Sequence, residues 1–328
     1  MLSRVADSIY WMSRYIERAD NVARFIDVNL NLMLDLPLGS AQQWQPLVNT
    51  TGDHEEFAKR YGAATQQNVI QFLTFDADNP NSILSCLRAA RESARSVREI
   101  ISSEMWEQLN KFYLMVTSAG ANPQILADPH EFFSAVRMSS HLFVGVTEAT
   151  MTHGEGWHFI RLGRMLERAD KTSRILDVKY FILLPTVAHV GTTFDDLQWA
   201  AVLRSASAFE MYRKLHGRIG PRRIVDFLLL NAEFPRAIHH CLIASRESEH
   251  AISGTPAGLF RNPAEQLLAQ LCTELAYAQV DEIVTSGLHE YLDELQTNMN
   301  LVGARVAETF FAARMAAPVA RKQKAAHS

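Results

Sequence analysis

An internal repeat constrains the fold of this chain more than any other feature of its sequence. The segment Arg14–Val28 returns as Arg164–Val178 after 150 residues without a gap, and eight of the fifteen aligned positions are identical. A second segment, Phe72–Val97, matches Phe227–Ile252 at a shift of 155 residues. Self-similarity at a fixed distance is the signature of a repeated structural unit. We therefore predict two diverged copies of one unit.

The repeated unit has the periodicity of α-helices. Ile9, Met12, Ile16, Ala19 and Ala23 recur at intervals of three and four residues, which is the spacing of one helix face. Glycine and proline residues separate comparable stretches along the whole chain. The pattern predicts an all-α helical bundle of about ten to twelve helices, made of two tandem diverged repeats with a pseudo-two-fold relation.

The repeat also predicts the boundaries of the two units. We expect a first helical repeat over residues 1–150, a second over 151–317, and one integrated domain formed by both. Residues 318–328 carry basic side chains without apolar periodicity, so a disordered basic tail is expected there. In the turn Asp76–Ser82, Asn79 or Asn81 is the expected N-cap of the following helix.

Composition excludes several classes of function. A net charge of −4 argues against a nucleic-acid binder, which usually presents a concentrated basic surface. Three cysteines without a Cys-x-x-Cys pair indicate neither a disulfide framework nor a structural zinc site. The N-terminus lacks the apolar core of a signal peptide, and no apolar run is long enough to span a membrane. We expect a cytoplasmic protein.

Two Glu-Arg stripes, one in each copy, are the most specific candidate sites. The candidate residues stack at helical spacing and comprise Arg14, Glu17, Arg18, Arg164, Glu167 and Arg168, and Asn21 and Lys171 are the next members of the two stripes. One interpretation is that they form ion pairs between helices, with Asp20–Arg24 and Asp170–Arg174 as pairs within a helix. The other is that both stripes face one cavity and hold a carboxylate or phosphate through two-pronged hydrogen bonds.

A second group is rich in arginine and favours an anion. It comprises Arg88, Arg91, Glu92 and Arg95. The second copy keeps an arginine and a glutamate, Arg246 and Glu247, at the positions of Arg91 and Glu92. That copy has Ile243 and His250 where the first has Arg88 and Arg95. Such asymmetry is typical of a duplication in which one copy keeps a binding role, although a solvated helix surface explains it equally well.

Metal and cofactor sites are not expected. Glu247 and His250 have the Glu-x-x-His spacing of di-iron bundles, but the matching motif on a partner helix is absent from the sequence. Signatures of a nucleophile elbow, a phosphate-binding loop, a dinucleotide fold and a zinc protease are also absent. These absences weaken the case for an enzyme without closing it.

Several stretches together resemble the bacterial alpha-E family, an all-helical domain with a Glu-Arg motif. They are Ser8–Asp20, Asp78–Ser82, Ala90–Glu99, Glu104–Asn110, Arg164–Asp170 and Phe234–Arg236. The resemblance implies a companion of circularly permuted ATP-grasp amidoligases, with transglutaminase-like and proteasome-like peptidase proteins in the same system. The motif residues carry over as Glu17, Arg18, Glu167 and Arg168, with Asp78, Asn79, Asn81, Arg91, Glu92 and Arg95 as lesser candidates.

These observations leave three functional hypotheses. The first is an accessory or co-catalytic partner of an ATP-grasp amidoligase in peptide synthesis or modification, which binds an anionic substrate or intermediate through the Glu-Arg motifs. The second is a stand-alone enzyme acting on amide bonds, with Glu17 or Glu167 as general base. The third is a structural scaffold. The hypotheses can be distinguished by whether Glu17 and Glu167 converge on a pocket or are each used in pairing between helices.

Overall fold

The computed structural model describes the whole chain except residues 35–43, 123–124, 126–127, 183–192, 257 and 313–328. The described residues form fifteen α-helices, a short π-helix and no strand. The N-terminal half contains α1 (Ser3–Leu34), α2 (Gln45–Thr51), α3 (His54–Tyr61), α4 (Gln66–Thr74), α5 (Ile83–Arg95), α6 (Ser103–Ala119) and α8 (His130–Thr150). The C-terminal half contains α9 (Glu155–Ile182), α10 (Thr193–Ser205), α11 (Phe209–His216), α12 (Pro221–Leu229), α13 (Ile238–Ser253), α14 (Pro263–Tyr277), α15 (Val280–Ser286), α16 (Leu288–Val306) and η2 (Ala307–Phe311).

The all-α prediction is confirmed, but the described residues hold more helices than expected. Glycines with positive φ end two of the short helices. Gly52 (φ 81°) ends α2 just before α3, and Gly217 (φ 72°) ends α11 just before α12. Glycine adopts this left-handed conformation without the steric penalty of a Cβ atom.

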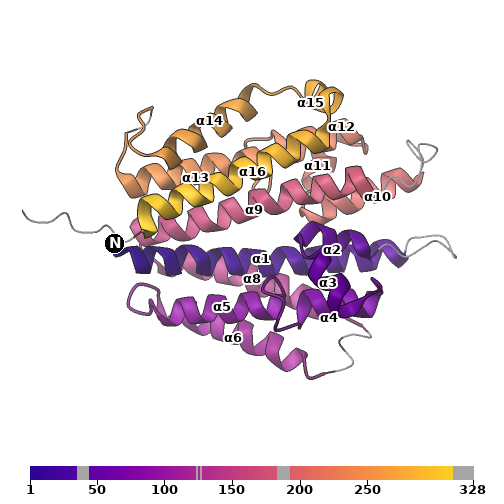
Figure 1. Ribbon diagram of the computed structural model, residues 1–328, viewed down its shortest axis with the longest axis horizontal. Helices are drawn as coiled ribbons and strands as arrows, with labels where there is room; N and C mark the ends of the chain where they lie inside the picture. Colours follow the sequence, from indigo (N-terminus) through magenta and orange to yellow (C-terminus); the bar gives the residue numbers. More distant parts are fainter. Residues whose placement is uncertain (35–43, 123–124, 126–127, 183–192, 257, 313–328) are drawn as a thin grey trace, which may run out of the picture.

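Helices α1 and α9 lie side by side through the middle of the molecule (Figure 1). They run in the same direction, because contacts between them advance together along both sequences. The amino group of Met1 lies 2.8 Å from a carboxylate oxygen of Glu155, Arg14 contacts Glu167, and Arg168 contacts Glu17. The expected boundary between the halves falls between Thr150, where α8 ends, and Glu155, where α9 begins.

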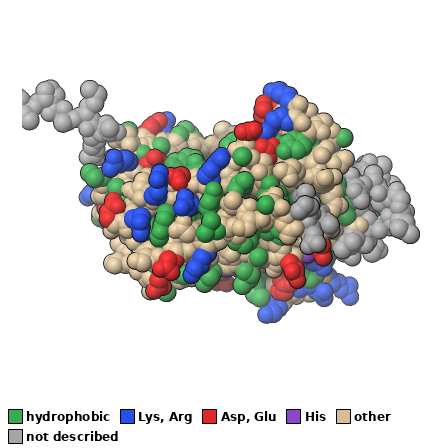
Figure 2. All heavy atoms as spheres, turned by 90° about the horizontal axis from the view of Figure 1, so that it is seen from below, with side chains coloured by type: hydrophobic (Ala, Val, Ile, Leu, Met, Phe, Trp, Pro, Cys, Tyr) green, Lys and Arg blue, Asp and Glu red, His purple; other side chains and the backbone are tan. Residues whose placement is uncertain are grey.

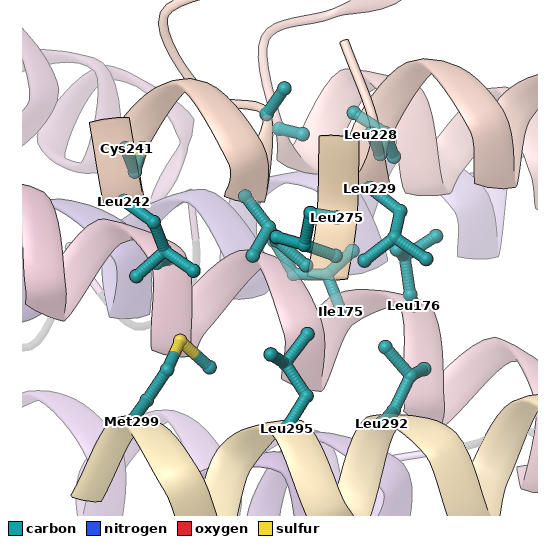
Figure 3. Packing of buried hydrophobic residues seen from close by; sticks show 14 of the residues in the cluster. Ile175, Leu176, Leu228, Leu229, Cys241, Leu242, Leu275, Leu292, Leu295 and Met299 are labelled. Carbon is teal, nitrogen blue, oxygen red and sulfur yellow. The ribbon is translucent and has the colours of Figure 1, made fainter. Parts of the chain in front are cut away.

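Each half packs some of its helices directly against its own long helix. In the C-terminal half, Ile175 and Leu176 of α9 belong to one apolar cluster with Leu275 of α14 and Leu292 and Leu295 of α16 (Figure 3). In the N-terminal half, α5 and α8 pack against α1, and α6 packs against α5 and α8.

Some side chains cross between the two clusters. Tyr10 of α1 lies in the apolar cluster of the C-terminal half, whereas Phe159 and Ile160 of α9 lie in that of the N-terminal half. The seam between α1 and α9 is therefore part of both cores.

The start of α5 differs from the expectation. Ser82 is its N-cap, because its hydroxyl accepts a hydrogen bond from the Ser85 amide at 3.1 Å. The prediction of Asn79 or Asn81 was wrong because their amide groups bind elsewhere. The Asn79 side chain donates to the Phe72 carbonyl at 3.0 Å, and that of Asn81 donates to Asp53 at 2.9 Å.

Two other expectations concern the C-terminal tail and the absence of a membrane-spanning helix. The tail predicted over residues 318–328 lies outside them. Among the helices that the structure does describe, none combines the length and the apolar character needed to cross a membrane.

Gly163 allows α1 and α9 to approach closely. A Cβ atom at this position would lie 2.5 Å from both the backbone oxygen of Tyr10 and the hydroxyl of Ser13. Gly145 on α8 offers a contrast, because a Cβ atom there meets nothing within 4 Å.

We expect Gly163→Ala to destabilise the protein by about 1–3 kcal/mol, because the added methyl group has to push the two helices apart. Gly145→Ala is the matched control and should be neutral or stabilising by up to about 1 kcal/mol, since alanine favours helix. Urea unfolding followed by circular dichroism measures both. Equal stability of Gly163→Ala and the wild type would contradict the close approach.

Candidate functional site

The carboxylate of Glu167 on α9 is fully buried and is held by two arginines of α1. Arg14 Nε lies 2.8 Å from Oε2, while Arg18 places Nε 2.7 Å from Oε1 and Nη2 3.1 Å from Oε2. Arg18 thus forms the two-pronged arrangement in which a guanidinium and a carboxylate match in geometry.

Glu17 on α1 forms the reciprocal contact. Both its oxygens lie 2.8 Å from nitrogens of Arg168 on α9, and Arg236 approaches Oε1 at 3.2 Å from the segment before α13. The Asn21 side chain donates to the same oxygen at 3.1 Å. The interpretation of the stripes as ion pairs between helices is therefore confirmed, and each glutamate is bound by arginines of the other half.

The network continues along both helices through two aspartates. Asp20 lies 2.8 Å from Arg24 and 2.6 Å from Arg236. The predicted pair within α1 is thus present, and it is buried rather than exposed to solvent, since the side chains of Asp20 and Arg24 are 1% and 2% exposed.

Asp170 has the same position on α9. It lies 2.9 Å from Lys171 and 3.0 Å from Arg174, which confirms the predicted pair within that helix.

Positive charge exceeds negative charge within this network. Its carboxylates are Glu17, Asp20, Glu167 and Asp170, and the cations within ion-pair distance of them are Arg14, Arg18, Arg24, Arg168, Lys171, Arg174 and Arg236. Among the described residues, seven cations therefore contact four carboxylates, an excess of three. Several of the cations keep some exposure: Arg14 and Arg18 are each 16% exposed and Arg168 is 12% exposed.

The network determines the ionisation of the two glutamates. Burial alone would raise the pKa of Glu17, but Arg168 and Arg236 outweigh burial and hold the pKa well below its usual range. Burial opposes ionisation of Glu167 in the same way, and Arg18 and Arg14 lower its pKa. Both groups are anions at neutral pH, and a carboxylate with so low a pKa is a poor general base.

Arg164, the remaining member of the stripes, lies at the edge of the network. Its Nη2 is 3.2 Å from Glu148 on α8, and its Nε has no hydrogen-bond partner among the described residues. Burial lowers the pKa of this guanidinium, and so does the neighbouring Arg168.

Of the lesser candidates, only Asn81 joins the network. Its Oδ1 accepts a hydrogen bond from Arg18 Nη1 at 2.8 Å. Asn79 is buried below it in the turn, and Asp78 is exposed, with its backbone amide donating to Asp76.

The arginine-rich group of α5 lies on the outer surface. Arg91 Nε donates to Asn110 at 2.6 Å, and its guanidinium lies over the rings of Trp106 and Tyr113. Arg95 pairs with Glu92 at 2.6 Å, and Arg88 donates to the Ala77 carbonyl at 3.0 Å. Figure 2, which shows the molecule from the side of α5 and α6, has basic side chains interspersed with acidic and hydrophobic ones.

The corresponding residues of α13 divide their contacts. Glu247 pairs with Arg161 of α9 at 2.8 Å, whereas Arg246 lines a cavity between α13 and α14. His250 bonds through Nδ1 to the Thr255 carbonyl at 3.1 Å. No group of three or more metal-ligating side chains occurs among the residues that the structure describes. The three cysteines are buried, and burial raises the pKa values of the Cys86 and Cys241 thiols to about 12.

Arg236 was not predicted as a site member, and Lys171 was placed in the second stripe but not among the candidate site residues. Arg236 contacts both Glu17 and Asp20, and at the shift of 155 residues it corresponds to Asn81, a neutral residue that gave no signal of charge pairing. Lys171 follows Asp170 directly in the repeat where the first copy has Asn21, so the change of charge was visible in the sequence.

Glu249 on α13 is a buried acid that lies outside the network. Neither of its oxygens accepts a hydrogen bond of normal geometry within the described part of the chain, although the side chain of Asn262 lies near enough to lower its pKa. Burial dominates and raises the pKa to about 8, and the neighbouring Glu265 adds to this effect. Glu249 is therefore largely protonated at neutral pH.

We expect Glu17→Gln and Glu167→Gln each to lower the free energy of unfolding at pH 7 by about 3–5 kcal/mol, because each leaves buried arginines without their anion. The depressed pKa values mean that this contribution is present above the usual carboxylate pKa and is lost only as the pH falls far below it. Denaturant unfolding between pH 7 and pH 3 measures it. The exposed pair Glu56–Lys59 supplies the control Glu56→Gln, which should leave the midpoint unchanged. Unfolding midpoints equal to that of the wild type would exclude a stabilising role for the network.

The raised pKa of Glu249 predicts the opposite dependence on pH. The folded protein keeps this proton up to a pH of about 8, whereas the unfolded chain releases it near 4.5, so stability is lost as the pH rises between these values. Glu249→Gln should therefore raise the thermal midpoint by a few degrees at pH 8.5 and have little effect at pH 4.5. The exposed Glu294→Gln is the control, and a constant difference across this range would refute the assignment.

Comparison with known proteins agrees with this description. Residues 1–311 match the model of a family described as a predicted alpha-helical domain with a conserved ER motif. Uncharacterised proteins of Mycobacterium bovis and Mycobacterium tuberculosis are 22% identical to the chain over 336 aligned positions, which cover 96% of the chain and 37% of each relative. The chain thus spans little more than a third of the length of these relatives, and no solved structure is significantly similar to it. On the evidence of the match over residues 1–311, this chain belongs to the Alpha-E family.

Proposed function

We propose that this chain is an accessory or co-catalytic partner of an ATP-grasp amidoligase in a cytoplasmic system for peptide synthesis or modification. In this role the cation-rich seam between α1 and α9 binds an anionic substrate or intermediate. The observation that carries the proposal is the excess of three cations in the buried network, because unbalanced positive charge at low solvent exposure attracts anions.

The form of the relatives supports a role beside another protein. In the mycobacterial proteins, the part similar to this chain accounts for 37% of the polypeptide, so a unit of this kind is covalently joined there to a much longer segment. The ATP-grasp class of the partner rests on the resemblance of the Glu-Arg stripes and of the segments around Asp78 and Arg91.

The arrangement of the network also supports a pseudo-two-fold relation between two tandem repeats. Glu17 binds Arg168 and Glu167 binds Arg18, so positions separated by 150 residues exchange equivalent contacts. An axis parallel to α1 and α9 relates such contacts when both helices run in the same direction.

A stand-alone enzyme that uses Glu17 or Glu167 as its base has less support. Both carboxylates have lowered pKa values and are already bound by arginines. A scaffold without a ligand explains the pairing, but it gives no reason for the surplus of cations.

Lys171 provides a test that leaves the carboxylates paired. Glu167 keeps Arg14 and Arg18, and Asp170 keeps Arg174, when Lys171 is replaced by Met. Lys171→Met therefore removes one surplus charge without leaving a buried charge alone.

We expect this chain to increase ADP release by a purified ATP-grasp protein encoded beside it, and Lys171→Met to reduce the increase at least threefold. Lys59→Met, which removes an exposed cation, should leave it unchanged. Absence of any increase together with absence of binding in a pull-down would refute the partnership. A full increase with folded Lys171→Met would refute only the anionic role of the seam.

A further inference from the structure

A cavity of about 480 Å³ lies between α13 and α14, away from the Glu-Arg stripes. Its lining includes Arg246, Glu247 and His250 of α13, Phe260 of the following loop, and Ala269 and Thr273 of α14. This volume is within the range of small-molecule sites, and the lining combines an aromatic ring with a few polar groups, as such sites commonly do.

The corresponding arginine of the N-terminal half has partners that the arginine of this cavity lacks. Arg91 and Arg246 correspond at the shift of 155 residues. Arg91 is satisfied by its own chain, because Asn110 accepts its hydrogen bond at 2.6 Å and the rings of Trp106 and Tyr113 lie within 5.6 Å of its guanidinium. All three of these residues come from α6.

Helix α14 offers Arg246 only small side chains. Ala269 and Thr273 face the cavity, and the Thr273 hydroxyl donates to the Ala269 carbonyl at 2.8 Å. Arg246 has no ion pair or hydrogen bond to any residue that the structure describes. The cavity therefore takes the place of the oxygen acceptor and aromatic surface that Arg91 receives from its own chain.

Glu247, the next residue of α13, adds a negative charge to the lining. Arg161 binds Oε2 of Glu247 at 2.8 Å from outside the cavity, which leaves Oε1 available. His250 donates from Nδ1 to the Thr255 carbonyl, so Nε2 is its remaining ring nitrogen. Phe260 is half exposed and supplies apolar surface.

From this arrangement we propose that the cavity binds a free α-amino acid with an apolar side chain. The ligand carboxylate pairs with Arg246, its ammonium group faces Glu247, and its side chain packs against Phe260. An ammonium group can donate to Oε1 of Glu247, whose other oxygen binds Arg161, whereas a ligand with a carboxylate alone has no donor for this oxygen. The site does not depend on the proposed partnership with an ATP-grasp protein.

Isothermal titration of the full chain with L-phenylalanine tests the proposal, with a dissociation constant on the order of 1 mM expected for a ligand of this size. Phenethylamine lacks the carboxylate and 3-phenylpropionate lacks the ammonium group, and each should bind at least tenfold more weakly. Arg246→Met should also weaken L-phenylalanine at least tenfold. Arg91→Met is the matched control at the corresponding position and should bind as the wild type does.

Filling the cavity gives an independent check. Thr273→Tyr places an aromatic ring where the ligand is expected and should abolish binding, while circular dichroism reports whether the variant folds. Failure of L-phenylalanine to bind the wild type, or equal binding by Arg246→Met, overturns the proposal. Equal binding of 3-phenylpropionate overturns the assignment of an amino acid.

Discussion

The reciprocal pairing of buried glutamates and arginines between α1 and α9 is the interaction on which the rest of the structure depends. Glu17 and Glu167 are almost completely buried, and each is bound by arginines of the opposite half. Removing such charges from water costs several kcal/mol per ion unless partners of good geometry replace the solvent. The pairs therefore form only when both helices have the correct register. That register in turn positions the helices packed on either side.

Close packing and charge pairing support one another along this seam. Gly163 brings the α9 backbone against Tyr10, and the approach allows short guanidinium–carboxylate contacts further along the helices. Tyr10 also belongs to the apolar cluster of the opposite half. The seam is consequently a shared core and not a surface between two independent domains. A surplus of cations within this seam creates a positive electrostatic potential that attracts anions, which is why we associate the seam with function.

The two halves differ on their outer surfaces. In the N-terminal half, α6 satisfies Arg91 with an amide and two aromatic rings. In the C-terminal half, the small residues of α14 leave a cavity beside Arg246. Divergence also occurs inside the network, where Arg236 adds a charge at the position of the neutral Asn81. Two halves with similar sequence segments can in this way share one stabilising interaction while their outer helices differ.

The sequence by itself determined the helical class and the pairs Asp20–Arg24 and Asp170–Arg174, because periodicity and i,i+4 spacing are local properties of the chain. It also identified Glu17 and Glu167, but it left open whether they meet a ligand or other helices. Only the tertiary structure showed that each glutamate pairs with arginines of the opposite helix, since the partner of a buried charge depends on which helix packs opposite and how closely. The same reason explains why Arg236 was missed and why Arg91 and Arg246, alike in sequence, have different surroundings. Contacts between distant segments depend on how the helices pack, and the spacing of residues along the chain does not specify that packing.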